Sequence, residues 1–251
     1  MATCLILIGP LTSFAKDEPE MTLAEWASQQ TEVLPEIVNG VKMYRPELAG
    51  DQLIISDMTD IPGGDARQIF LKALMYVREK SDPLKERIEA VDFKNLRFTV
   101  RCDKEKLNDD ASETYSYTEA YQGTKGLLAF TCGDMSVSFK EKGLIPRTLK
   151  FEKLKPQSNQ RDRNWIESQS FILSEKVADL SKYIKLRDNI KVTHEDEIIK
   201  GKIVQGMNPD EVVLTLGQPF SKRKSGGRDK WLFESGASLI FTDGVVSHIM
   251  F

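Results

Sequence analysis

A short acidic run with one histidine holds the residues best suited to chemistry in this chain: His194-Glu195-Asp196-Glu197. A histidine beside three carboxylates has the donor atoms to hold a metal ion. Carboxylates also stabilise the positive end of a helix, so we interpret the run as a solvated helix start. The sequence contains no Gly-x-Ser-x-Gly elbow, His-Glu-x-x-His pair, phosphate loop or Cys-x-x-Cys pair. It therefore predicts no catalytic, cofactor-binding or metal-binding residues, and a protein that is not an enzyme.

Five basic residues crowd the chain on either side of a Gly-Gly pair: Lys222, Arg223, Lys224, Arg228 and Lys230. Such a cluster can attract an acidic partner or anionic head groups. A run of charges can equally be a solvated face with no partner. We take Lys222, Arg223, Lys224 and Arg228 as the candidate interaction residues. The formal net charge of -3 gives no reason to expect nucleic acid as the partner.

Two cysteines, Cys102 and Cys132, lie in strand-like segments. In an oxidising compartment they can close a disulfide, and two separate buried thiols are an equally good interpretation. A zinc site would need four grouped ligands, and both histidines of the chain are far from the cysteines in sequence. We expect His248 to share a face of the last strand with Val246 and Met250, as a packed or edge-exposed residue rather than a catalyst.

The first fifteen residues differ in composition from the rest of the chain. They carry no charge and contain Leu5-Ile6-Leu7-Ile8, and the small residues Ser13 and Ala15 precede the charged residue Lys16. We expect residues 1–15 to be a truncated secretory signal, with a buried N-terminal strand as the alternative. The mature protein is then periplasmic or associated with the outer membrane. No later run approaches the roughly 20 apolar residues of a spanning helix, so we expect no transmembrane segment, and peripheral membrane association stays open.

The clearest structural signals lie near the C-terminus. Asn208 can cap a helix that begins at Pro209, Glu211 can complete a capping box, and Gly217 can end the helix. Strand patterns follow at 231–233, 238–241 and 245–251. The pair Asp243-Gly244 between two of them is a strong hairpin signal.

These C-terminal residues resemble the SmpA/OmlA (BamE) family of small cell-envelope lipoproteins. The matching pieces are Gly206-Met207, Glu211-Val212, Leu216-Gly217-Gln218-Pro219, Trp231-Leu232-Phe233 and Leu239–Val246. The resemblance implies that residues 191–251 form an αα-βββ module of two helices and a three-stranded antiparallel meander. It also implies a binding or assembly role at the outer membrane rather than catalysis, without naming a partner.

The preceding part of the chain has the pattern of a helix, a set of strands and a second helix. The first helix spans Ala66–Val77 after a cap at Asp65, and its predicted buried face consists of Ala66, Ile69, Phe70, Ala73, Leu74 and Val77. The second begins near Arg163, and its apolar residues recur at near-helical intervals: Trp165, Ile172, Val177, Leu180 and Ile184. Strand patterns occur at 41–44, 53–55, 96–102, 113–121, 127–132, 135–140 and 148–154, with an insertion near Asn108-Asp109-Asp110 that departs from a simple hairpin. This order predicts an α+β domain over residues 16–190.

That order resembles a family of uncharacterised envelope domains with a TATA-box-binding-protein-like (TBP-like) fold. The matching features are Val33-Leu34-Pro35 with Asn39-Gly40-Val41, the helix pattern of residues 66–77, and Trp165-Ile166-Glu167 ahead of the second helix. The resemblance implies helices packed on one face of a curved antiparallel sheet. It implies nothing about DNA binding.

We therefore expect a non-enzymatic, exported cell-envelope protein whose partner is another envelope protein. The composition is that of a globular chain, with 40% hydrophobic and 29% charged residues. A first alternative is a carrier that holds a small apolar or lipidic ligand in the N-terminal domain. A second is a hydrolase, which would need a nucleophile, a base and oxyanion donors that converge in space.

Overall fold

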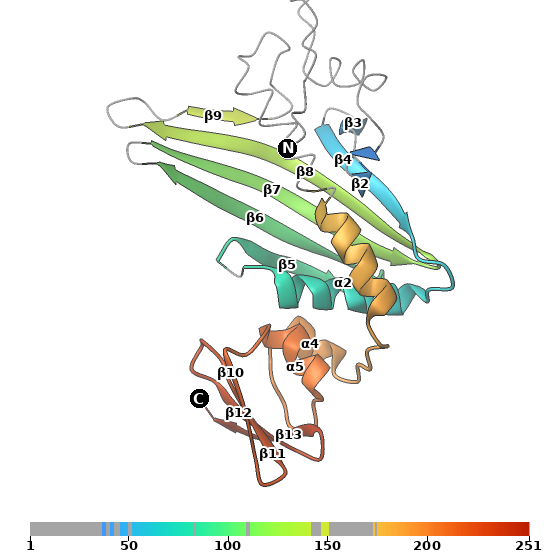
Figure 1. Ribbon diagram of the computed structural model, residues 1–251, viewed down its shortest axis with the longest axis vertical. Helices are drawn as coiled ribbons and strands as arrows, with labels where there is room; N and C mark the ends of the chain where they lie inside the picture. Colours follow the sequence, from blue (N-terminus) through green and yellow to red (C-terminus); the bar gives the residue numbers. More distant parts are fainter. Residues whose placement is uncertain are drawn as a thin grey trace, which may run out of the picture.

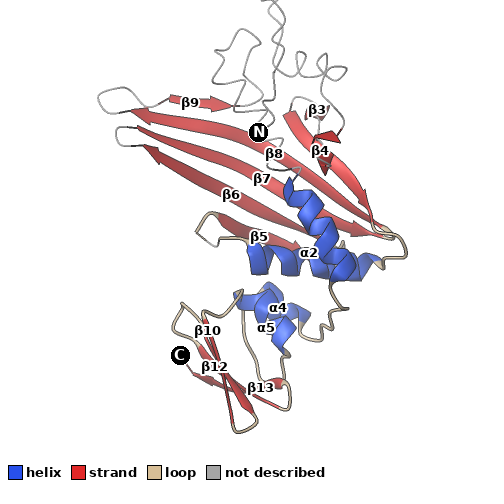
Figure 2. Ribbon diagram, viewed as in Figure 1, coloured by secondary structure: helices blue, strands red, loops and turns tan. Residues whose placement is uncertain are grey.

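The computed structural model describes residues 37–38, 41–42, 46–49, 52–82, 84–108, 111–141, 147–150, 173 and 175–250. Over these residues the protein is α+β with antiparallel sheets, as the sequence predicts. A large sheet packs against α2 (Ala66–Lys80) and the helix over residues 175–186, and two further helices separate α2 from a small sheet (Figure 1). The layers are therefore sheet, helices and sheet, as the colouring by secondary structure also shows (Figure 2).

Seven strands form the large sheet, in the order β3-β4-β8-β7-β6-β5 with β9 beside β8. Every neighbouring pair is antiparallel. The strands are β3 (Pro46–Ala49), β4 (Gln52–Asp60), β5 (Glu86–Asp92), β6 (Arg97–Asn108), β7 (Ala111–Thr124), β8 (Leu127–Glu141) and β9 (Arg147–Lys150). A separate pair consists of β1 (Ile37–Val38) and β2 (Val41–Lys42).

Two details of the large sheet differ from the sequence prediction. The strands predicted at 127–132 and 135–140 are one strand, because β8 continues through Gly133, which pairs with Thr118 beside a bulge in the β7 ladder. A glycine inside a strand often accompanies such a bulge, so it does not require a turn. The insertion predicted near residue 109 is wrong, because the antiparallel pairing of β6 with β7 extends to Asn108 and Ala111. The charged edge strand β5 has no clear apolar alternation and was not predicted.

The helix α2 begins where the sequence predicts. The Asp65 side chain caps it by accepting a hydrogen bond of 3.0 Å from the Gln68 backbone N–H. The face predicted to be buried is confirmed at Ile69, Phe70, Ala73, Leu74 and Val77. Further buried residues of the helix are Leu71, Met75 and Tyr76. The burial is wide because α2 contacts β7 and β8 of the large sheet and also the C-terminal helix α5.

The C-terminal part contains α4 (Glu195–Ile199), α5 (Pro209–Leu216) and four strands. The strands are β10 (Ser221–Ser225), β11 (Arg228–Leu232), β12 (Ser238–Thr242) and β13 (Val245–Met250). The sheet therefore has four strands rather than the predicted three, because the basic run before residue 226 forms an additional edge strand that pairs with β11. The predicted hairpin is confirmed, with positive φ angles of 53° at Asp243 and 80° at Gly244, as a tight β-turn of this kind requires.

Some predicted features lie outside the described residues. These are the secretory signal at 1–15, most of the segment before the first strands, and the start of the second helix near Arg163. Within the described part of that helix, Val177, Leu180 and Ile184 are buried, as predicted. No helix in the described ranges is long and apolar enough to cross a membrane.

Candidate interaction surface

The five basic residues of the C-terminal sheet are all exposed on the β10–β11 hairpin: Lys222, Arg223, Lys224, Arg228 and Lys230. They do not share one surface. Arg223 lies directly opposite Lys230 in the ladder, and side chains alternate along each strand. Arg223, Arg228 and Lys230 therefore lie on one face of the sheet, and Lys222 and Lys224 lie on the other.

Lys222 has a partner inside the module. Its ammonium group lies 4.1 Å from the centre of the Trp231 ring, directly across the ladder, in a cation–π contact. Trp231 is buried against Phe233 and Phe241, so this is the side of the sheet that faces the core. Lys222 thus helps to cover the core of the module, and it is a weaker interaction candidate than the sequence suggests.

The opposite side of the small sheet combines basic and apolar side chains. Lys230 pairs with Ile240, which pairs with His248, and Arg228 and Met250 lie on the same side in neighbouring rows. Met250 is an exposed hydrophobic residue, with 42% of its surface accessible. We call this side the outer face and define it by Arg223, Arg228, Lys230, Ile240, His248 and Met250.

The position of His248 corrects one prediction. A bulge between Ile240 and Phe241 shifts the register, so that Val246 pairs with Phe241 and is buried while His248 is exposed on the outer face. His248 therefore shares its face with Met250 but not with Val246. The sequence could not show this, because an extra residue in one strand reverses the alternation beyond it.

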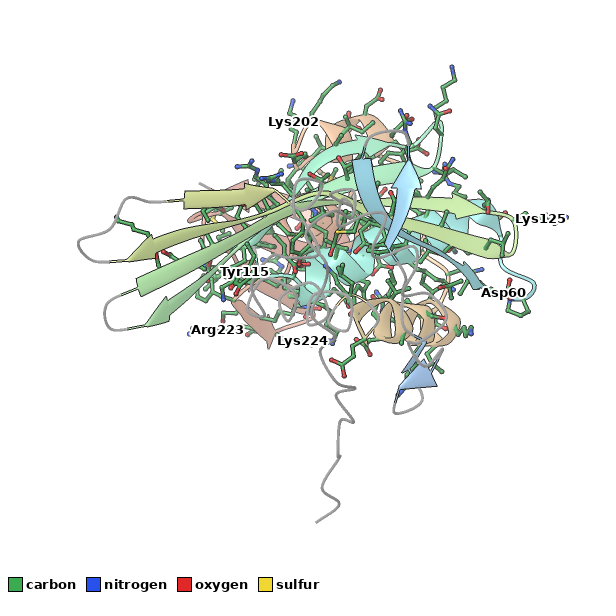
Figure 3. All side chains as sticks on the ribbon, turned by 90° about the horizontal axis from the view of Figure 1, so that it is seen from above. Asp60, Tyr115, Lys125, Lys202, Arg223 and Lys224 are labelled. Carbon is green, nitrogen blue, oxygen red and sulfur yellow. The ribbon has the colours of Figure 1, made fainter. Side chains whose placement is uncertain are left out.

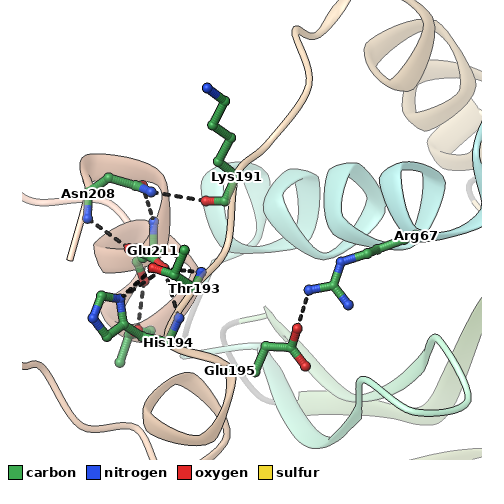
Figure 4. A network of polar contacts seen from close by, with 8 residues as sticks. Arg67, Lys191, Thr193, His194, Glu195, Asn208 and Glu211 are labelled. Carbon is green, nitrogen blue, oxygen red and sulfur yellow. Dashed lines mark hydrogen bonds and ion pairs between the residues drawn. The ribbon is translucent and has the colours of Figure 1, made fainter. Parts of the chain in front are cut away.

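A buried carboxylate holds the N-terminus of α5 (Figure 4). The Asn208 side chain accepts from the Glu211 backbone N–H at 3.0 Å, and Glu211 accepts from the Asn208 backbone N–H at 2.8 Å, which confirms the predicted capping box. Glu211 also accepts from the backbone N–H groups of Thr193 at 2.6 Å and His194 at 2.9 Å. Burial raises the pKa of Glu211, but these hydrogen bonds outweigh it and leave the pKa below its ordinary value.

The same carboxylate fixes the segment that joins the two parts of the chain. Ile190 in this segment exchanges two hydrogen bonds with the Gln68 side chain of α2, at 2.8 and 3.0 Å. Arg67 of α2 also forms an ion pair with Glu195 at the start of α4. The boundary predicted between residues 190 and 191 therefore lies in a segment that is hydrogen-bonded to both parts, and it stays a prediction.

Sequence reasoning missed a buried ionic cluster under the helix over residues 175–186. The Lys176 ammonium lies 2.7 Å from Glu119 of β7 and 3.3 Å from Glu86 of β5, and Tyr121 donates to Glu119 at 2.7 Å. Glu119 is fully buried. Burial disfavours the charged ammonium, but the two carboxylates outweigh it and raise the pKa of Lys176. A signal did exist, since Lys176 lies three residues after buried Leu173 and four before buried Leu180, on the core side of the helix.

The two cysteines lie beside this cluster on different strands. Cys102 is on β6 opposite Tyr117, and Cys132 is on β8 opposite Glu119, so β7 runs between them. Two strand spacings put their Cα atoms about 10 Å apart, beyond the roughly 7 Å that a disulfide spans. Both are thiols and fully buried. The geometry thus favours separate buried thiols over the disulfide.

The acidic run with a histidine is the start of a helix, as interpreted from the sequence. Glu195, Asp196 and Glu197 form the first turn of α4, and the His194 ring lies 3.0 Å from Glu211. Within the described ranges, no three His, Cys, Asp or Glu side chains are grouped closely enough to hold a metal ion. The prediction that the chain is not an enzyme stays a prediction.

Comparison with known proteins gives structural neighbours only. No family model and no curated protein matches the chain. A TBP-like protein from Parabacteroides distasonis ATCC 8503 is similar at 13% identity over 56% of this chain and 97% of that chain, with a TM-score of 0.46. A DUF4468 family protein from Bacteroides ovatus ATCC 8483 is similar at 12% identity, with a TM-score of 0.44. The likeness covers 59% of this chain and 94% of that protein.

At these scores the likenesses carry no argument about activity. The first neighbour has the fold type predicted for residues 16–190. Neither neighbour is described as a SmpA/OmlA protein, so the resemblance of the C-terminal module to that family stays a prediction.

Proposed function

We propose that the chain is a non-enzymatic, exported cell-envelope protein that binds an acidic partner protein through the outer face of its small sheet. The observation that carries the proposal is the composition of that face. Arg223, Arg228 and Lys230 are exposed there beside Ile240 and Met250. A face that combines apolar side chains with arginines has the composition found at protein interfaces.

The cations of the outer face have no counter-charge within the described chain. None of Arg223, Arg228 and Lys230 forms a salt bridge with another described residue, whereas basic residues such as Arg187 and Lys176 do. An acidic partner would supply the missing charge and increase the rate of encounter. The composition of residues 1–15 supports export, and an exported protein would meet such a partner in the cell envelope.

The alternative explanation of these cations is protection of a sheet edge. β10 is one of the two edge strands of the small sheet, and lysines on an edge strand discourage pairing with other chains. The two explanations require different residues. Edge protection needs the charges of β10 on either face of the sheet, whereas docking needs only the charges of the outer face, which include Lys230 of the inner strand β11.

The test is a pull-down from the cell envelope with the mature protein as bait, followed by affinity measurements on what it recovers. The variant Arg223→Glu/Arg228→Glu should weaken binding at least tenfold, and added salt should weaken wild-type binding because it screens exposed charges. Lys125→Glu/Lys202→Glu is the matched control, since it makes the same change in net charge at exposed sites away from Arg223 and Lys224 (Figure 3).

Circular dichroism should show the same fold for both double variants, since exposed charges contribute little to stability. If the control weakens binding as much as the outer-face variant, the effect is one of net charge and the proposed surface is wrong. If neither affects binding and the salt series is flat, the outer face is a solvated surface.

A further inference from the structure

A cleft of about 510 Å³ lies where the two parts of the chain meet. One wall is the C-terminal end of α2 with the start of β5, and the other is the connection from α5 to β10 with the turn after β11. Apolar side chains from both walls line it: Val77, Ile88, Leu216, Phe220 and Phe233. Phe220 is 64% exposed, so the cleft has an exposed apolar rim that the described residues do not cover.

Arg78 is the unusual residue of this cleft. Its Nε atom is buried and has no hydrogen-bond partner. No salt bridge connects its guanidinium with any described carboxylate. Burial lowers the pKa of Arg78, and no neighbouring charge contributes. Arg78 is partly buried, and arginines removed from water are normally paired, so a buried Nε without a partner is unusual.

The acidic residues of the cleft are engaged elsewhere or exposed. Glu79 accepts from the Tyr183 hydroxyl at 2.9 Å, and Glu86 lies 3.3 Å from the Lys176 ammonium. Glu234 is exposed on the turn after β11. The second arginine of the cleft, Arg87, differs from Arg78, because its side chain is 74% exposed and lies 3.5 Å from Glu89. Arg78 is therefore the cation in the cleft that lacks a counter-charge.

We propose that this cleft binds a small amphipathic carboxylic acid, with the carboxylate on Arg78 and an apolar chain along Leu216, Phe220 and Phe233. A guanidinium can donate two parallel hydrogen bonds to a carboxylate, and the pair is strong where water is excluded. The volume lies in the range of small-ligand sites, which typically combine an apolar lining with a few polar groups. The cleft is separate from the outer face, and it lies at the junction of the two parts rather than inside the N-terminal sheet domain.

Decanoate is a suitable probe, because it has one carboxylate and a chain of unbranched methylenes. Isothermal titration of the full chain below the micelle concentration should show 1:1 binding of decanoate. Decanol, which has the chain without the charge, should bind at least tenfold more weakly. The variant Arg78→Gln should weaken decanoate binding to the level of decanol, while Arg87→Gln, the matched arginine of the same cleft, should leave it unchanged.

Stability measurements distinguish this site from a structural role of Arg78. If Arg78 serves ligand binding rather than stability, Arg78→Met should unfold at the same or a higher urea midpoint without ligand, because the change removes a partly buried charge that has no ion-pair partner among the described residues. Decanoate should raise the thermal midpoint of the wild type but not of Arg78→Met. The proposal is overturned if decanoate does not bind, if decanol binds as tightly, or if Arg78→Gln keeps the wild-type affinity. Binding that requires Arg87 as much as Arg78 would also contradict it.

Discussion

Glu211 is the residue whose removal tests the structure most directly. Its side chain is 1% exposed, and it accepts from the backbone N–H groups of Thr193, His194 and Asn208 and from the Thr193 hydroxyl. A hydrogen bond to a charged group contributes about 1.5 to 3 kcal/mol, and buried donors left without an acceptor are costly. Because the joining segment can relax and admit water, we expect Glu211→Ala to cost about 3 to 5 kcal/mol rather than the full sum.

Urea unfolding measures this cost, with Glu234→Ala as the control. Glu234 is exposed on the turn after β11, so its removal should change stability by less than about 0.5 kcal/mol. Limited proteolysis adds a local readout: the hydrogen bonds of the segment should protect the wild type between Lys185 and Glu197, and Glu211→Ala should admit cleavage there. If Glu211→Ala is no more destabilising than Glu234→Ala, the carboxylate does not hold the segment and the network is wrong.

Acid titration gives an independent check on the same residue. The hydrogen bonds keep the pKa of folded Glu211 below its ordinary value of 4.5, so the stabilisation is present above that value and is lost as pH falls through the lower folded pKa. The variant Glu211→Gln should therefore lose less stability between pH 5 and pH 3 than the wild type. An identical acid dependence in both proteins would contradict the assigned pKa direction.

Three further predictions concern packing. Lys176→Met should destabilise by about 3 to 5 kcal/mol in urea unfolding, because it leaves buried Glu119 without its cation, and Lys176→Met combined with Glu119→Gln should recover part of the loss. Gly123→Ala should lower the thermal midpoint strongly, because an added Cβ would lie 2.4 Å from a backbone oxygen of α2. If the variant is as stable as the wild type, the helix can move away from the sheet. Phe241 is 3% exposed, so Phe241→Ala should lower the free energy of unfolding by about 3 to 5 kcal/mol, whereas Asn208→Ala should lower it by about 1 kcal/mol. A lower urea midpoint for Asn208→Ala than for Phe241→Ala would refute the assigned core face.

Signals that act over a few residues were readable from the sequence alone. Asn208, Pro209 and Glu211 start α5, and Asp65 starts α2, because a cap requires only a side chain and backbone N–H groups within one turn. Asp243 and Gly244 form their hairpin for the same reason, since the turn needs two residues that tolerate positive φ. The α+β class and the buried face of α2 also followed from periodicity.

Features that depend on register or on distant partners were decided by tertiary structure. The basic run divides between two faces of the small sheet because β10 pairs with β11, and a bulge turns His248 away from Val246. The ion pair between Lys176 and Glu119 joins residues 57 positions apart. Arg78 has no ion-pair partner among the described residues because its acidic neighbours Glu79 and Glu86 contact Tyr183 and Lys176 instead. The sequence determines local structure because caps and turns are satisfied within a few residues, whereas the pairing of a buried charge depends on which distant groups packing brings within hydrogen-bond distance.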